Sequence, residues 1–274
     1  MSGAVSQPEF PPLSAGNLKR IRSLHQKKYR DAEGAFIVEG IRLCEEALAS
    51  KMRIRQAVTT ADAMKNERLA ALISECSRRA IPVFQATAAQ FRTLSEEPAP
   101  QGLAFIVDKP GPKIKPESTP LILALDRLQD PGNLGTILRS AEWFGVPVLL
   151  LGEGTVDAGN AKVVRSAMGA LFRLSLYEKV DLPQQLSRLK SAGYRIIGTA
   201  AGAGITLPEA VPSQKDVLLI GNEGSGLSDK VAHSVDDFIS IPGAGGESLN
   251  AAVAASIFLY HFSVFKREDH DSGR

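Results

Sequence analysis

The stretch that decides the fold is Val217-Leu218-Leu219-Ile220-Gly221-Asn222-Glu223-Gly224-Ser225-Gly226-Leu227. Its first four residues form an unbroken apolar run, which is typical of a strand buried on both faces of a parallel sheet. The glycines that follow allow backbone N–H groups to face a ligand. Glu223 places a charge at the strand end, where losing water is costly unless the carboxylate has a partner. A tight turn with a solvated carboxylate would have the same sequence, so this loop alone leaves both interpretations open.

Short apolar runs recur on both sides of this stretch. They cover residues 121–125, 146–151, 194–198 and 238–241. Helical patterns lie between them, and Leu182, Leu186 and Leu189 mark one helix that would cover the sheet. This alternation predicts an α/β domain with a parallel sheet between helices. Ligands of such sheets bind beyond the carboxyl ends of the strands, so the loops after the apolar runs are the candidate sites.

Two more of these loops carry chemical groups. After residues 121–125, a Pro-Gly turn precedes Asn133, the predicted N-cap of a helix that holds Arg139 in its early turns. After residues 238–241, a glycine-rich loop leads to Ser248, the predicted N-cap of a last helix that is apolar nearly all round until Phe265. A subunit interface is one explanation for such a helix. The first loop could also be an ordinary capped helix with a surface arginine. The second could be a flexible loop before an N-cap.

Several other kinds of site lack their signatures. No GxGxxG follows a strand and no GxxxxGK[ST] is present, so the better-known nucleotide-binding patterns are missing. The four histidines show no ligand spacing, which argues against metal catalysis and against a serine–histidine hydrolase. Cys44 and Cys76 form no CxxC pair and are predicted to be reduced thiols of a cytosolic protein. Residues 1–13 lack the apolar core of a secretory signal, and residues 251–262 are too short to span a bilayer.

A proline-rich break predicts two domains. Residues 108–120 contain four prolines, which cannot donate to a sheet and fix φ, so this stretch is predicted to be a linker. We therefore expect a flexible tail over residues 1–14, a first domain over 15–107, a second domain over 121–267 and a short tail over 268–274. Helical and strand patterns alternate in the first domain and predict a small α/β sandwich.

The charges are unevenly distributed between these parts. Residues 1–107 hold 15 Lys and Arg against 11 Asp and Glu, whereas residues 121–274 hold 14 against 17. Residues 17–30 predict one basic helix. Its cations are Lys19, Arg20, Arg22, Lys27, Lys28 and Arg30. This charge favours a polyanionic partner, and a solvated charged face is the alternative.

Together, the three loops resemble the three signature motifs of the SpoU (TrmH) family of RNA methyltransferases. The segments that carry the resemblance are residues 133–141, 219–227 and 241–254. They occur in the family's order, each at the end of a predicted strand. Residues 165–170 resemble the family's middle segment, and residues 36–40 and 101–102 resemble its ribosomal-protein-like substrate-recognition domain.

The resemblance implies a SPOUT-type catalytic domain with a parallel sheet and a deep trefoil knot, beside a smaller N-terminal α/β substrate-binding domain. It implies S-adenosylmethionine as the methyl donor, no metal, and a cytoplasmic homodimer without membrane attachment that packs through the knotted region. The implied substrate is RNA, and the front domain favours ribosomal RNA over tRNA. The implied donor-binding residues are Thr199, Gly221, Ile241 and Leu249. The residues implied around the reacting ribose are Asn133, Arg139, Glu223, Ser248 and Asn250. The basic residues of the predicted helix over residues 17–30 would bind the RNA.

Physical chemistry refines the implied roles. A sulfonium is already a strong methyl donor, so the protein has to align a ribose 2′-oxygen and handle one proton. The family's arginine is often suggested as the base, but a guanidinium stays protonated in proteins. We therefore expect Arg139 to hold the adjacent phosphate and to stabilise negative charge on oxygen, with Glu223 orienting and partly neutralising it.

Two other functions compete with this prediction. A non-catalytic RNA-binding or ribosome-assembly protein would have the same fold, but the presence of Arg139, Glu223 and Asn250 favours the enzyme. A nucleotide-dependent α/β oxidoreductase is disfavoured by the missing dinucleotide signature.

Overall fold

The computed structural model describes residues 10–202, 204–245 and 248–271. The chain divides into two compact units, which we describe separately. The first contains the residues up to Lys109 together with Gly159–Arg165, and the second contains Pro110–Ala158 and the residues from Ser166 onward. The division after Lys109 falls within the predicted linker.

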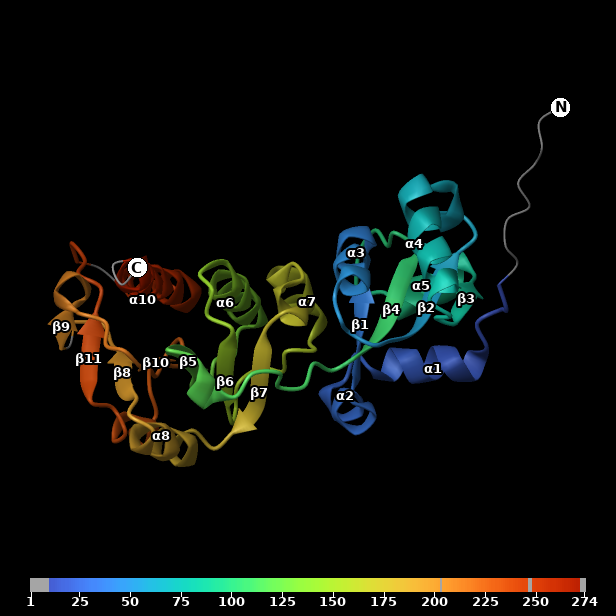
Figure 1. Ribbon diagram of the computed structural model, residues 1–274. Helices are drawn as coiled ribbons and strands as arrows, with labels where there is room; N and C mark the ends of the chain where they lie inside the picture. Colours follow the sequence, from blue (N-terminus) through green and yellow to red (C-terminus); the bar gives the residue numbers. More distant parts are fainter. Residues whose placement is uncertain (1–9, 203, 246–247, 272–274) are drawn as a thin grey trace. The chain divides into compact units, whose positions relative to one another are not determined.

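The first unit is an α/β sandwich around a four-stranded sheet (Figure 1). In spatial order its strands are β1 (Ala35–Glu39), β4 (Leu103–Asp108), β2 (Ile54–Thr60) and β3 (Val83–Ala86). The β2–β3 pair is parallel and the other two pairs are antiparallel. Its helices are α1 (Ala15–Ser23), α2 (Lys27–Glu33), α3 (Ile41–Ala49), α4 (Glu67–Arg78) and α5 (Ala88–Leu94), and the short turn η1 spans Ala63–Lys65. Helices α1 and α5 pack on the sheet face that carries Ile37 and Ile106. Side chains alternate along a strand, so the buried residues of α3 and α4 cover the other face.

The prediction of one helix over residues 17–30 is wrong, because the chain breaks between α1 and α2. The Arg30 side chain is buried, and its Nη1 donates to the carbonyl oxygens of Leu24 (2.7 Å) and His25 (2.6 Å). These carbonyls lie at the end of α1, where a helix leaves carbonyl groups without intrahelical partners. Arg30 therefore closes the end of α1, and its assignment to an RNA-binding face is wrong.

The start of the first unit also differs from the prediction. The backbone N–H of Leu13 donates to Gln85 (2.7 Å) and that of Gln85 donates to Pro11 (2.9 Å), so residues 11–13 extend the sheet beside β3. Leu13 is buried, although it was predicted to lie in a flexible tail. Residues 1–9 and 272–274 of the two predicted tails lie outside the described residues.

The second unit is built on a seven-stranded sheet in which every neighbouring pair is parallel. In spatial order its strands are β7 (Ser175–Val180), β6 (Val148–Gly152), β5 (Leu121–Leu125), β10 (Asp216–Ile220), β8 (Arg195–Thr199), β11 (Asp237–Ser240) and β9 (Ile205–Thr206). The five predicted apolar runs correspond to β5, β6, β8, β10 and β11, so the parallel α/β fold is confirmed. The two strands at the edges of the sheet, β7 and β9, were not predicted.

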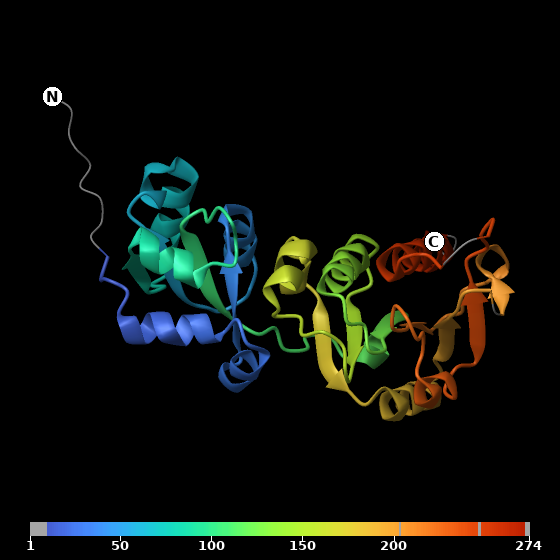
Figure 2. The ribbon, with the colours of Figure 1, turned by 180° about the vertical axis from the view of Figure 1, so that it is seen from behind.

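Helices cover both faces of this sheet, as Figures 1 and 2 show from opposite sides. The remaining helices of the chain are α6 (Pro131–Trp143), α7 (Ala161–Ala167), α8 (Leu182–Ser191), α9 (Asp229–Ala232) and α10 (Ala251–Asp271). The short turns are η2 (Pro116–Ser118), η3 (Ala170–Phe172) and η4 (Leu207–Glu209). Helix α8 buries Leu182, Leu186 and Leu189 against one face, as predicted. Helices α6 and α10 pack together on the opposite face.

Part of the predicted linker packs on the second unit. The backbone N–H groups of Lys113 and Ile114 donate to Ser175 Oγ (2.8 and 3.0 Å), and the Tyr194 hydroxyl donates to the carbonyl of Pro116 (3.0 Å). Strand β10 comes late in the chain but lies between β5 and β8. The trefoil knot that the resemblance implies stays a prediction.

Candidate active site

The three predicted loops emerge from neighbouring strands at one edge of the sheet. In register, Ile220 at the end of β10 lies beside Leu125 at the end of β5, and Leu219 lies beside Gly198 of β8. Ile239 of β11 in turn lies beside Thr199 of β8. Because all these strands are parallel, their carboxyl ends meet at this edge, where ligands of such sheets bind.

Three side chains from distant parts of the sequence meet there in a hydrogen-bonded chain. Asn133 Nδ2 donates to Glu223 Oε1 (3.0 Å), and Asn250 Nδ2 donates to Asn133 Oδ1 (2.9 Å). We call Asn133, Glu223 and Asn250 the polar trio. Asn133 is partly buried, whereas Glu223 and Asn250 are exposed, so the trio is open to a ligand. The structure thus brings together three of the five residues predicted around the ribose.

Both helices that carry trio residues are capped differently from the prediction. Asp130 is the N-cap of α6, and its Oδ1 accepts from the backbone N–H of Asn133 (2.7 Å). Asn250 caps α10, because its Oδ1 accepts from the backbone N–H groups of Ala252 (2.9 Å) and Val253 (3.3 Å). The predictions of Asn133 and Ser248 as the caps are therefore wrong. The capping bonds hold the Asn250 amide in one orientation, with its Nδ2 towards Asn133.

Glu223 binds the beginning of α6. Its Oε1 also accepts from the backbone N–H of Asp130 (3.1 Å), and its Oε2 accepts from the N–H of Gln129 (3.3 Å). Burial raises the pKa of the Glu223 carboxyl, but the hydrogen bonds from Asn133 and from the backbone outweigh this effect and lower the pKa below its ordinary value. Glu223 is therefore an ionised carboxylate at a helix N-terminus, where negative charge is favoured.

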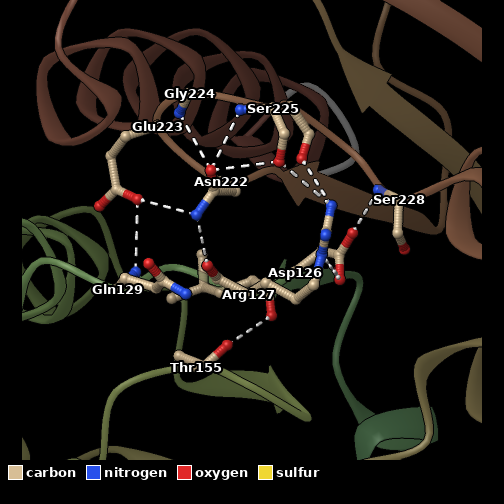
Figure 3. A network of polar contacts seen from close by, with 11 residues as sticks. Asp126, Arg127, Gln129, Thr155, Asn222, Glu223, Gly224, Ser225 and Ser228 are labelled. Atoms are coloured by element: carbon tan, nitrogen blue, oxygen red, sulfur yellow. Dashed lines mark hydrogen bonds and ion pairs between the residues drawn. The ribbon is translucent and has the colours of Figure 1, made fainter.

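The loop over residues 221–227 is folded around one side chain that the sequence analysis did not single out (Figure 3). Asn222 Oδ1 accepts from the backbone N–H groups of Gly224 (3.0 Å) and Ser225 (3.1 Å). Those two groups therefore face Asn222, and the prediction that the glycine loop presents them to a ligand is wrong. Asn222 Nδ2 donates to the carbonyl of Arg127 (2.9 Å), which ties the loop to the end of β5. The signal for this role was Gly224 and Ser225 two and three residues after Asn222, a spacing that suits an Asx turn.

Gly221 has a steric reason to be glycine. A Cβ at this position would lie 2.3 Å from the carbonyl carbon of Gly226. The backbone of Asn222 pairs with that of Gly226 in both directions (2.9 and 3.0 Å), so the loop closes directly against Gly221. Any side chain there would open the loop.

Arg139 and Ser248 do not contact the polar trio. Arg139 is exposed on α6 and has no hydrogen-bond or ion-pair partner among the residues that the structure describes. It lies six residues after Asn133, about 9 Å further along the helix and on a different side of it, and so not in the early turns. Among the described residues of this chain Glu223 does not pair with Arg139, and the predicted pairing stays a prediction. Ser248 is exposed two residues before Asn250, and Gly246 and Glu247 of the third motif lie outside the described residues.

Two sequence profiles of known families match the chain. Residues 120–260 match the sequence profile of the SpoU rRNA methylase family. The chain belongs to the SpoU rRNA methylase family. Residues 16–104 match the MRM3-like substrate-binding domain. The family that the three loops predicted is confirmed.

Relatives in the SpoU family span nearly the whole chain. The 23S rRNA (guanosine(2553)-2'-O)-methyltransferase RlmP of Bacillus subtilis (strain 168) is 34% identical over 245 residues, 89% of this chain and 94% of the relative. The SpoU methyltransferase AviRb from Streptomyces viridochromogenes, solved in complex with the cofactor AdoMet, matches with a TM-score of 0.82 and 26% identity over 93% of this chain and 99% of that chain. The AdoMet-bound rRNA methyltransferase from Sinorhizobium meliloti matches with a TM-score of 0.81 and 29% identity over 93% and 97%.

The residues predicted to bind the methyl donor of a SpoU enzyme lie at the ends of three neighbouring strands. Thr199 ends β8, Gly221 follows β10 and Ile241 follows β11. Leu249 precedes the trio residue Asn250, and half of its side chain is exposed. Apolar side chains beside backbone polar groups suit a flat, partly apolar ligand such as adenosine. The residues present therefore fit S-adenosylmethionine. Thr199 Oγ1 already donates to the carbonyl of Leu219 (2.9 Å), so this hydroxyl braces the sheet.

The structure also bears on the other predicted partners. Lys19, Arg20, Arg22, Lys27 and Lys28 are exposed, and Arg20 pairs with Glu33 (3.4 Å). No group of three or more His, Cys, Asp or Glu side chains is placed to hold a metal within the described part of the chain. No helix within residues 10–202, 204–245 and 248–271 is long and apolar enough to cross a membrane.

Proposed function

We propose that this protein transfers a methyl group from S-adenosylmethionine to a ribose 2′-hydroxyl of ribosomal RNA. The observation that carries the proposal is the polar trio, which joins the three family loops at the carboxyl edge of the sheet. The family membership and the AdoMet-bound relatives support the donor. The relative RlmP is named for 2′-O-methylation of 23S rRNA, and its similarity covers both units of the chain.

When bound, S-adenosylmethionine supplies an activated methyl group, so the protein's task is to place and polarise the hydroxyl. In the trio, Asn133 uses one N–H on Glu223 and its oxygen on Asn250. Each of the two amides keeps an N–H for a further acceptor. These groups are fixed by capping and by the ionised carboxylate, so they are preorganised to stabilise negative charge that develops on the 2′-oxygen.

In this mechanism Glu223 acts through Asn133, and the proton of the 2′-hydroxyl passes to water, to which the trio is open, as the methyl group leaves the sulfonium for the oxygen. The two oxygens of Glu223 accept hydrogen bonds from Asn133, Asp130 and Gln129, and its pKa is lowered. A carboxylate whose charge is stabilised in this way is a weak base. We therefore assign Glu223 a positioning role.

We further propose that the active form is a homodimer that packs through α6 and α10. These helices contact each other through Ser140 and Ser256 (Oγ–Oγ 2.7 Å) and through the rings of Phe144 and Tyr260 (centroids 5.9 Å apart). On the same pair of helices, Trp143 is 81% exposed, Tyr260 58% and Val253 49%. Exposed apolar side chains gathered on neighbouring helices are typical of an interface.

The dimer also supplies a role for Arg139. Arg139 and Trp143 are four residues apart on α6, so they share a helix face. Arg139 would then lie within the dimer interface, with a guanidinium that has no hydrogen-bond or ion-pair partner among the described residues of its own chain. We propose that it reaches the ribose and phosphate bound at the partner's trio, where it stabilises negative charge. Ser248 lies two residues before Asn250, a member of the trio. We propose that it contacts the nucleotide bound at the trio of its own chain.

The first unit is proposed to bind the RNA. Lys19 and Arg22 on α1 and Lys27 and Lys28 at the start of α2 are exposed cations that can neutralise phosphates. An enzyme with ribosomal RNA as its substrate would work in the cytoplasm.

The test is methyl transfer to ribosomal RNA isolated from cells that lack the protein, with radiolabelled S-adenosylmethionine. Label in a 2′-O-methylated nucleotide, mapped by its resistance to alkaline cleavage, is the expected result. RNA binding without transfer would favour the ribosome-assembly alternative. Transfer to tRNA alone would contradict the proposed substrate.

A further inference from the structure

The residue after Asp126 has an unusual backbone for its type. Arg127 follows β5 with φ +56°, in the left-handed region that side chains with a Cβ rarely adopt. Hydrogen bonds on both sides hold it there. The N–H of Asp126 donates to Ile220 (2.9 Å), the carbonyl of Arg127 accepts from Asn222 Nδ2 (2.9 Å), and the carbonyl of Leu128 accepts from Val156 (2.8 Å). A residue kept in a sparsely populated conformation at a ligand-binding edge points to a function for its side chain.

The guanidinium of Arg127 lies over the loop of residues 221–227 (Figure 3). Its Nη2 is 3.4 Å from Ser225 Oγ and 3.5 Å from the carbonyl of Gly226, so both hydrogen bonds are long. Its Nε is buried without a hydrogen-bond partner and lies 3.6 Å from Asp126 Oδ1. The other carboxylate oxygen of Asp126 accepts from the N–H of Ser228 (2.6 Å). The side chain is 39% exposed, so a planar cation with little of its hydrogen-bonding capacity in use is open to solvent beside the loop of residues 221–227.

We propose that Arg127 is a further RNA-positioning residue, which binds a phosphate next to the reacting ribose. This inference rests on the proposed function, because it takes RNA as the substrate. Asn222 Nδ2 donates both to the carbonyl of Arg127 and to Glu223 Oε2 (3.4 Å), so one amide links the backbone of Arg127 to the trio. The guanidinium fork matches two phosphate oxygens, and each nucleotide of the RNA brings such a phosphate.

The backbone of Arg127 provides an unusually clean test. Glycine adopts a positive φ without steric cost, so Arg127→Gly removes the guanidinium and keeps the loop. The matched control is Lys179→Gly on β7, because Lys179 is also an exposed cation with positive φ (+55°) in the same unit. The full-length chain is assayed with the ribosomal RNA that the wild type methylates. The readouts are the melting temperature, S-adenosylmethionine affinity, the KM for RNA, and the dependence of RNA affinity on salt.

For Arg127→Gly we expect a melting temperature within a few degrees of the wild type, because relief of the positive φ offsets the lost contact with the buried Asp126 carboxylate, and we expect unchanged donor affinity. The KM for RNA should rise about three- to tenfold, with a smaller change in the single-turnover rate at saturating RNA, and the salt slope should fall by roughly one charge. Arg127→Lys should restore the salt slope of RNA affinity but reverse only part of the increase in KM, because an ammonium lacks the planar pair of donors of a guanidinium. Lys179→Gly should match the wild type in donor affinity, in the KM for RNA and in the salt slope, and its melting temperature shows what the change to glycine at a positive φ does by itself.

Three results would overturn the inference. A KM for RNA and a salt slope equal to those of the wild type would leave Arg127 without a role in RNA binding. Weakened donor binding would assign the guanidinium to the donor's carboxylate. A lowered melting temperature with both affinities reduced would make Arg127 a brace for the loop. Failure of the proposed function is distinguishable from all of these, because the wild type itself would then methylate no RNA.

Discussion

The ionised state of Glu223 offers the most direct test of the trio. In Glu223→Gln, the side-chain oxygen can keep the two shorter bonds, from Asn133 (3.0 Å) and Asp130 (3.1 Å). The new amide nitrogen then faces two donors, the N–H of Gln129 (3.3 Å) and Asn222 Nδ2 (3.4 Å), and both of those bonds are lost. Each bond contributes about 0.5–1 kcal/mol in a partly solvated place, and the loss of charge weakens the remaining pair. We expect a loss of about 1–2 kcal/mol in the free energy of unfolding, which lowers the melting temperature by roughly 2–6 °C.

The sign of the pH dependence follows from the lowered pKa of Glu223. A carboxyl with a lower pKa in the folded state stabilises the fold above its unfolded pKa of about 4.3, and this contribution disappears as the pH falls through the folded pKa. The stability gap between the wild type and Glu223→Gln should therefore be full at neutral pH and should close in acid. Thermal denaturation from pH 7 to about pH 3 measures it.

Methyl transfer adds a second readout for the same variant. A neutral amide oxygen holds Asn133 more weakly than the carboxylate does, so the Asn133 amide is less firmly oriented, and we expect the single-turnover rate to fall about 10- to 100-fold. Asp181→Asn is a suitable control, because this carboxylate caps α8 through the N–H of Gln184 (3.1 Å), away from the trio, and Asn caps equally well. A Glu223→Gln protein that is as stable and as fast as the wild type at pH 7, or a stability gap that persists in acid, would refute the reasoning.

The remaining predictions concern Arg139, the dimer, the basic face and the donor. Arg139→Ala should lower the single-turnover rate by roughly 100-fold or more with unchanged donor affinity, and Arg139→Lys should recover little; a rate near that of the wild type would remove Arg139 from the mechanism. When the Arg139→Ala and Asn133→Ala proteins are mixed and allowed to exchange subunits, half of the dimers contain one chain of each kind, and each mixed dimer has one intact site. The mixture should therefore regain about a quarter of the wild-type activity. No recovery would show that Arg139 acts at the site of its own chain. Replacing Lys27 and Lys28 with Ala should flatten the salt dependence of RNA affinity, while Arg30→Ala should lower the melting temperature; an unchanged slope would mean that the basic face is only solvated. S-adenosylmethionine at about 100 times its Kd should stabilise the fold by about 2.7 kcal/mol, and a melting shift with NADH instead would contradict the choice of donor.

The sequence predicted the central strands of the second sheet but not the two strands at its edges. Strands β5, β6, β8, β10 and β11 are buried on both faces, so they read as apolar runs. Strand β7 lies at an edge of the sheet, where Glu178 is partly exposed and Lys179 is exposed, so its sequence lacks a continuous apolar run. Strand β9 has only two residues and no pattern at all. The break between α1 and α2 was hidden because Arg30 counts as a surface residue in any pattern, whereas here it is buried against two carbonyl groups.

For the site, the sequence located the loops but not the bonds between them. Asn133, Glu223 and Asn250 were all singled out, yet the partner expected for Glu223 was Arg139. That choice paired opposite charges, whereas the fold satisfies the carboxylate with backbone N–H groups at the start of α6. Asn222 and Arg127 were missed because their roles depend on loop conformation, namely an Asx turn and a positive φ, which no spacing of residues reveals.

The bond between Asn250 and Asn133 joins residues that are 117 positions apart. A protein is made from its N-terminus, so the first half of this site exists long before its last member. Until α10 has docked, the Asn133 amide has its bond to Glu223 but lacks the bond from Asn250 to its oxygen. The nascent chain can fold most of the seven-stranded sheet and still lack a complete active site. Activity therefore requires α10 to be docked on α6, so methyl transfer reports on the folding of this part of the second unit.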